Sequence, residues 1–75
     1  MWNHRIVDVS DGVEEPIYEI REVFYNSKGL PYGHSDAAIV GENLEEMQEV
    51  LYQFAEAFNK PILNSTTDFH NAIDN

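Results

Sequence analysis

The sequence predicts an α+β domain in which a three-stranded antiparallel meander packs against one C-terminal helix. The first half of the chain holds short β-branched and aromatic runs between turn signals. The second half holds one amphipathic pattern with helical spacing, over residues 43–58. A chain of 75 residues has room for one small domain. We therefore expect a single β-β-β-α domain over residues 1–63, followed by a polar tail, 64–75, that either forms a short helical turn or frays.

Three segments have the composition of strands. The segment 5–10 is short and β-branched, and 17–25, "IYEIREVFY", is the richest in strand-forming residues. The "NSKG" turn at 26–29 predicts a hairpin between the second strand and the third, with Gly29 in the left-handed conformation. The third strand is expected within 30–41, where "AAIV" is the best strand sequence and the early proline and glycine favour an edge or a bulge. An Asp-Gly signal and a proline predict an irregular loop over 11–16.

The helix has clear start and stop signals. Asn43 is a good N-cap, and Glu46 stands three residues later, as in a capping box. The helix should stop at "NKP", where Asn59 can take the left-handed cap and Pro61 cannot continue the helix. One apolar stripe is expected to pack on Ile20 and Phe24 of the sheet: Leu44, Met47, Leu51, Phe54 and Phe58.

The second strand is apolar on both faces, which leaves one face of the sheet in need of a cover. Ile17, Val23 and Tyr25 point away from the face that the helix should occupy. The C-terminal tail, a second copy of the chain or another protein could cover them. We expect a homodimer or a docked partner at these three residues, with a two-fold axis as the default for a dimer.

Charge is the strongest compositional feature. Fourteen acidic residues face four basic ones, for a formal net charge of −10. Such a chain is repelled by nucleic acid and by anionic membranes, so we expect neither as a direct partner. The charge serves either solubility alone or the binding of a basic protein, including one that handles nucleic acid.

The acidic residues of the helix gather in one strip. At 100° per residue, Glu45, Glu49, Tyr52 and Glu56 fall on the outward side. Glu45 and Glu49 form a like-charge i, i+4 pair, and Glu56 lies near the unfavourable end of the helix dipole. Local helix stability therefore does not explain this strip, and we predict that it is a partner-binding face anchored by Tyr52.

The search for catalytic or metal-binding residues gives little. The three histidines are scattered, and the chain has no cysteine. His34 and Asp36 could share a strand face, but such pairs are common by chance. We expect no catalytic site, metal or cofactor, and therefore no enzyme. Without a signal-peptide pattern or a run of apolar residues long enough to span a membrane, the chain is expected to be cytoplasmic.

Two resemblances add to this interpretation. Through "YEIREVFY", "SKGLP", "LEEMQEVL" and "KPIL", residues 4–63 resemble a group of short, acidic, mostly uncharacterised proteins of bacteria and bacteriophages. That resemblance implies a fold and supplies no activity. The β-β-β-α order with "GENLEEMQEVL" is also similar to the antitoxin domain of HicB-like proteins, which implies binding to a small RNA-cleaving toxin. The chain departs from that pattern, because no clear acidic-strand and proline-glycine segment precedes the helix and no DNA-binding appendage follows it.

Three classes of function follow, in order of preference. The first is a small acidic, non-enzymatic adaptor or inhibitor that binds another protein. The second is a HicB-like antitoxin, which a neighbouring gene for a small basic toxin would favour. The third is a small enzyme or metal-binding protein, which a metal-dependent thermal shift would favour.

Overall fold

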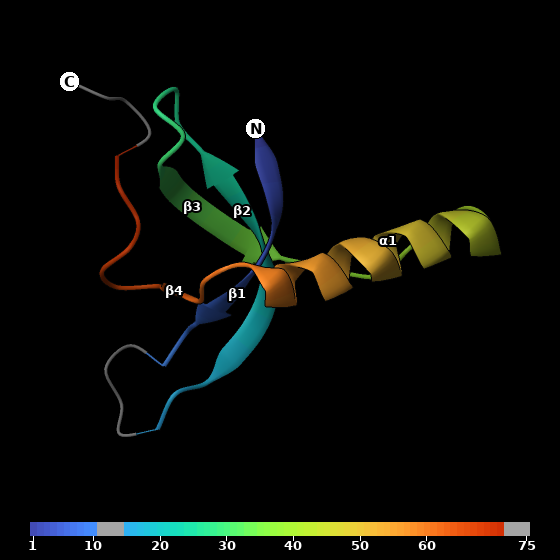
Figure 1. Ribbon diagram of the computed structural model, residues 1–75, viewed down its shortest axis with the longest axis horizontal. Helices are drawn as coiled ribbons and strands as arrows, with labels where there is room; N and C mark the ends of the chain where they lie inside the picture. The colour runs from blue at the N-terminus through green and yellow to red at the C-terminus, as the bar shows by residue number, and fades with distance from the viewer. Residues whose placement is uncertain (11–14, 72–75) are drawn as a thin grey trace.

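The computed structural model describes residues 1–10 and 15–71, and it has an α+β fold (Figure 1). The predicted loop at 11–16 lies mostly outside the described residues. Within them the elements are, in chain order, β1 (Trp2–Asp8), β2 (Tyr18–Tyr25), β3 (Pro31–Asp36), α1 (Leu44–Glu56), the 3-10 turn η1 (Ala57–Asn59) and β4 (Leu63–Asn64).

The strands form one sheet in the order β3-β2-β1-β4. β1, β2 and β3 make the predicted antiparallel meander. β4 is an addition to the prediction: its two residues pair in parallel with the end of β1, Val7 opposite Leu63 and Asp8 opposite Asn64. A two-residue strand is too short to show any hydrophobic period, so the sequence pattern could not reveal it.

The hairpin turn forms as predicted, but the third strand ends early. Gly29 has φ 78°, and the Asn26 side chain accepts hydrogen bonds from the backbone N–H groups of Lys28 and Leu30. A register shift next to Tyr25 accommodates Pro31 at the start of β3. The "AAIV" segment, 37–40, is not a strand: it leaves the sheet after Asp36 and leads to the helix. The β-propensity of this segment does not decide its conformation, although β2 extends past Arg21 to Tyr18 at that end of the sheet.

The helix begins where the sequence predicts. The Asn43 side chain accepts from the Glu46 N–H at 2.9 Å, while the Glu46 carboxylate accepts from the backbone of Glu42, one residue before the usual capping-box partner. α1 gives way to η1, and the chain leaves in an extended conformation at Lys60, as the residue before a proline favours. Asn59 therefore lies in the 3-10 turn and does not take the predicted left-handed cap.

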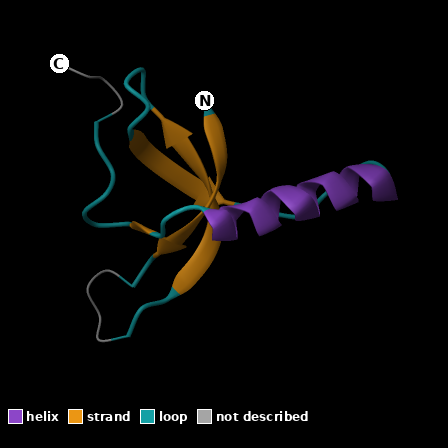
Figure 2. Ribbon diagram, in the orientation of Figure 1, coloured by secondary structure: helices purple, strands orange, loops and turns teal. Residues whose placement is uncertain are grey.

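The predicted packing of the helix on the sheet is wrong for most of its length. α1 has no buried residue, and it projects from the sheet as an arm (Figure 2). Only its C-terminal end meets β1, where the Phe54 ring lies 4.6 Å from the ring of His4 and Ala57 is buried. Of the predicted core stripe, Leu44, Leu51 and Phe58 are 80%, 50% and 69% exposed. The helical period identified the apolar face, but it carries no information on what covers that face.

The resulting shape is open. The radius of gyration is 13.4 Å, whereas about 11 Å is expected for a chain of this length. The buried apolar core is correspondingly small, with Ile6, Val7, Val23 and Ala57 as its buried members. This core lies around β1, the strand that is flanked by β2, β4 and the end of the helix.

Phe54→Ala tests the one anchored part of the helix. Because Phe54 is only half-buried, we expect a loss of about 2–3 kcal/mol of unfolding free energy, less than the ~3–5 kcal/mol of a fully buried phenylalanine. Gln53→Ala, at the exposed neighbouring position, should change it by less than about 0.5 kcal/mol. Urea unfolding followed by circular dichroism measures both. Equal losses in the two variants would contradict the anchor at His4.

Asp8 closes the loop between β1 and β2. Its carboxylate accepts from the N–H of Ser10 at 3.0 Å and from the N–H of Ile17 at 3.3 Å. The hydrogen bonds from Ser10, followed by the one from Ile17, lower the pKa of Asp8 below its ordinary value of 3.8. A lowered folded-state pKa stabilises the fold above the unfolded value, and this contribution disappears as pH falls through the folded value.

Asp8→Asn should therefore lower the melting temperature at neutral pH, where the carboxylate is charged in the wild type. The difference between wild type and variant should shrink as pH falls below about 3.8, because the wild-type carboxyl then becomes protonated too. Thermal melts from pH 7 to pH 2.5 measure this difference. A gap that stays constant across this range would show that the charge of Asp8 has no part in holding the loop.

Candidate functional site

The projecting helix is the most accessible element of the molecule, and it has two unlike faces. Its acidic strip is confirmed as a feature of the surface: Glu45, Glu49, Tyr52 and Glu56 are all exposed, Tyr52 by 63%. They occupy about 60° of the helix circumference. The apolar stripe lies on the other side of α1. Whether the strip binds a partner stays a prediction.

No basic side chain neutralises the strip. Within residues 1–10 and 15–71, both ion pairs are made by Arg21, and neither reaches α1. The last turn of the helix also lacks a basic residue. Its acidic residues therefore remain available to a partner in solution.

The two arginines are held on the sheet instead. Arg5 and Arg21 stand opposite each other on β1 and β2. Arg5 donates to the Tyr25 hydroxyl at 2.9 Å and to the carbonyl of Pro61, which ties the start of the C-terminal segment to the sheet. Arg21 pairs with Glu19 and Asp36, and its Nε donates to His34 at 2.7 Å. Arg21 is therefore neutralised by carboxylates, whereas among the described residues Arg5 has only neutral acceptors and its Nε is buried without a hydrogen-bond partner.

His34 and Asp36 do share a face, as the sequence suggested, and Arg21 joins them. An arginine at hydrogen-bond distance from both is a poor neighbour for a metal cation, because it already takes their acceptor atoms and adds a positive charge. Within the described part of the chain, no group of three or more histidine, cysteine or acidic side chains could hold a metal ion. This cluster is therefore structural: it fixes β3 to β2.

The second predicted interface is already covered. Val23 is fully buried, and Tyr25 is half-buried with its hydroxyl bonded to Arg5 and to the Asn3 side chain. Ile17 precedes β2 and remains 53% exposed. The face that holds Val23 and Tyr25 is thus not open to a partner, and the expected contact there is corrected for these two residues. The sequence analysis named three surfaces that could cover this face, and in the structure the C-terminal segment covers it.

The C-terminal segment lies along the side of the sheet opposite α1 (Figure 1). The Phe69 ring sits 4.8 Å from the ring of His34, and the N–H of His70 donates to the carbonyl of Pro31 at 2.7 Å. Asn64 organises the turn that precedes them, since its side chain accepts from Thr66 and Thr67 and its N–H donates to Asp68. Residues 64–71 are therefore packed against the fold, and within them a side-chain-bonded turn stands where a short helical turn was one expectation. Residues 72–75 of the expected tail lie outside the described residues.

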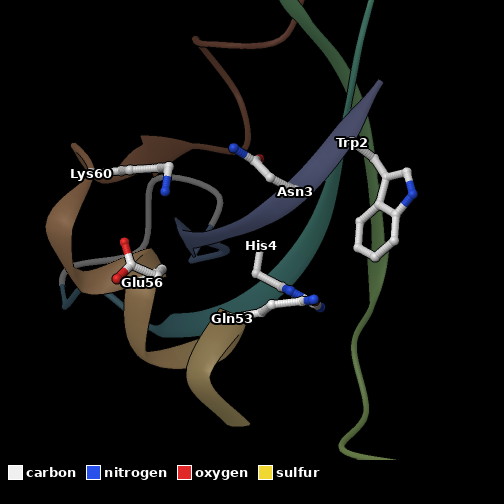
Figure 3. Close-up of a pocket in the computed structure, with 6 residues that line it drawn as sticks. All are labelled: Trp2, Asn3, His4, Gln53, Glu56 and Lys60. Atoms are coloured by element: carbon white, nitrogen blue, oxygen red, sulfur yellow. The ribbon is translucent and has the colours of Figure 1, made fainter. Parts of the chain in front are cut away.

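A small cavity lies where the helix meets β1 (Figure 3). It measures about 270 Å³ and is lined by Trp2, Asn3, His4, Gln53, Glu56 and Lys60. Glu56 and Lys60 stand on one side, Trp2 on the opposite side, and His4 and Gln53 between them. His4 is buried between the rings of Trp2 and Phe54. The histidine therefore acts as a packing residue, and the cavity is too shallow and mixed in chemistry to define a ligand.

A second depression runs along the apolar stripe. The 37–43 segment folds back against the first turn of α1 so closely that a Cβ on Gly41 would lie 2.7 Å from the backbone nitrogen of Met47. The open groove between them has a volume of about 490 Å³ and is lined mainly by Ile39, Leu44, Met47 and Leu51. Sequence reasoning missed this groove, because it placed Ile39 in a strand and the helix stripe in the core.

No protein-family model, curated protein or solved structure matches this chain. The resemblances to short acidic bacterial and phage proteins and to HicB-like antitoxins therefore stay predictions. In the described residues, no helix is both long enough and apolar enough to cross a membrane.

Phe69→Ala should loosen the C-terminal segment from the sheet. Loss of the half-buried ring next to His34 should cost about 1–3 kcal/mol, less than for a core phenylalanine. His70→Ala is the matched control, because the bond from residue 70 to Pro31 uses the backbone and survives the change. Urea unfolding gives both values. If the two variants are equally stable, the segment is not held through Phe69.

Proposed function

We propose that this chain is a small, acidic, non-enzymatic protein-binding module whose recognition element is the outward strip of α1. The partner is a basic protein, of the kind that handles nucleic acid, and the module acts on it as an adaptor or inhibitor. The observation that carries this proposal is a projecting helix with three exposed glutamates around an exposed tyrosine, to which neither of the ion pairs in the described residues extends.

The distribution of charge supports this partner class. The chain carries a net charge of −10, and both arginines are engaged on the sheet, away from α1. The net negative charge of the chain therefore attracts a basic protein from a distance, and the glutamates of α1 are the carboxylates that this protein contacts. Tyr52 supplies the apolar contact area that charges alone do not provide, since aromatic residues contribute much of the energy in interfaces.

The form of the helix supports a binding role over a purely solubilising one. Charges spread over any surface keep a small protein in solution, and they do not need a helix that leaves the body of the domain. α1 is held at its C-terminal end alone, so its strip is accessible to a large partner without obstruction from the sheet.

The test is capture of partners on the immobilised chain from its host at low salt, followed by calorimetry with the purified partner. Glu45→Lys with Glu49→Lys should abolish binding and leave the circular dichroism spectrum of the chain unchanged, because both side chains are exposed. Added salt should weaken binding of the wild type, since screening reduces attraction between opposite charges.

A charge-matched pair of variants separates the strip from net charge. Glu49→Lys and Glu15→Lys change the total charge equally, but Glu15 is an exposed residue before β2. Only Glu49→Lys should weaken binding strongly. Unchanged affinity in the folded double variant, or equal loss in the matched pair, would mean that the strip serves solubility alone.

A further inference from the structure

The apolar side of α1 is uncovered along its first two turns. Leu44, Met47 and Leu51 are 80%, 37% and 50% exposed, and Ile39 and Val40 beside them are exposed as well. Leu44, Met47, Leu51 and Ile39 line the groove of about 490 Å³ between the helix and the segment before it. Apolar side chains at consecutive helical turns form a contiguous stripe, and scattered single exposures do not produce such a pattern.

An uncovered helix of this length lacks a source of stability. Isolated helices shorter than about 12–15 residues are marginal in water, and α1 has 13 residues. The like-charge pair Glu45 and Glu49 and the absence of a basic last turn make it weaker still. Most helices in proteins gain their stability by packing an apolar face. The stripe of α1 therefore needs a surface that this copy of the chain does not provide.

The same chain leaves an apolar sheet surface uncovered. By the pleat, Trp2 lies on the same face as His4, and β2 contributes Tyr18, Ile20 and Phe24 to it, with the half-buried Glu22 among them opposite His4. α1 packs mainly on β1. Trp2 and Tyr18 are 50% and 56% exposed, and the other two apolar residues of β2 are half-buried. The chain thus has an apolar helix face without a sheet and an apolar sheet face without a helix.

The chain exposes more surface than a compact monomer of its mass, and the excess is comparable to the area that one partner buries in an interface. A folded monomer of 8.6 kDa is expected to expose about 4,700 Å². This chain exposes 5445 Å², an excess of roughly 750 Å². A standard stable complex buries about 800 Å² on each partner.

We propose that a second copy of this chain covers the apolar side of α1, and that the protein is a two-fold symmetric homodimer. The helix of each copy packs through Leu44, Met47 and Leu51 on the apolar surface of the other. In a two-fold symmetric dimer each contact occurs twice. One arrangement therefore covers the helix stripe and the sheet surface of both copies. The acidic strips stay outward on both copies. The proposal does not depend on the proposed function, since it uses the opposite side of the helix.

Charge distinguishes this occupant from a basic partner. The centre of the stripe, at Leu44, Met47 and Leu51, is apolar, and Glu45 is the one charged residue that lines the groove. Most of this surface therefore offers a basic protein nothing to pair with. Two copies bring together two net charges of −10. Salt screens that repulsion, so self-association should strengthen with added salt, whereas binding of a basic partner to the strip should weaken.

The test is sedimentation equilibrium of the full chain at micromolar concentrations, at low and at high salt. We expect a dimer whose dissociation constant falls as salt is added. Leu51→Lys should raise that constant by about 10- to 100-fold, which corresponds to exposing a leucine side chain to water. This variant also lowers the net negative charge, so repulsion cannot account for its effect. Glu49→Lys, on the strip and outside the lining of the groove, should leave the chain dimeric.

A measurement on the wild type covers the case in which Leu51→Lys does not fold. Amide hydrogen exchange of residues 44–56 should slow as the concentration of the chain rises through the dissociation constant, because a packed helix opens less often. A wild-type chain that remains monomeric up to hundreds of micromolar overturns the proposal. So does a folded Leu51→Lys variant that dimerises as tightly as the wild type, because the dimer then uses another surface.

Discussion

Two arginines that face each other across β1 and β2 determine how the rest of the chain is arranged. Arg5 holds the carbonyl of Pro61, and Arg21 holds His34, against which Phe69 packs. The C-terminal segment therefore occupies one face of the sheet. The other face is left for the helix, which meets it only near its own C-terminal end. The open shape of the molecule follows from this division of the sheet.

The same arrangement decides where charge is found. Arg21 is paired with Glu19 and Asp36, and Arg5 is bonded to Tyr25 and Pro61, so neither arginine reaches the glutamates of α1. The helix then has an acidic side and an apolar side, and within one copy of the chain the apolar side is used mainly near Phe54, where it meets His4. Our two proposals assign one side to a basic partner and the other to a second copy. Opposite responses to salt keep them separable.

Much of the fold could be predicted from local sequence signals. Asn43 and Glu46 predicted the helix start, Gly29 the hairpin turn, and the β-branched runs the meander. The acidic strip also lies where helical periodicity put it. These features depend on residues close together in the chain, which is why a pattern reveals them.

The features that the sequence did not predict depend on distant residues. β4 has only two residues, and its pairing with Val7 and Asp8 leaves no period to detect. Val23 is covered by a polar segment, and although the C-terminal tail was one of the expected covers, no sequence pattern distinguished it from a second copy or another protein. The apolar stripe of α1 was assigned to the core because amphipathicity indicates that a face needs covering and does not indicate which surface covers it.

The pairing of β4 with β1 also has a consequence for how the chain folds. The β1-β2-β3 meander joins neighbours in sequence, whereas Val7 and Leu63 lie at opposite ends of the chain. Closing so long a loop costs entropy, and it must follow the formation of the strand on which β4 docks. During synthesis on the ribosome, the sheet face around Val23 stays open until Phe69 has emerged and can pack on His34. Throughout that interval, the abundant negative charge of the nascent chain keeps incomplete sheets apart.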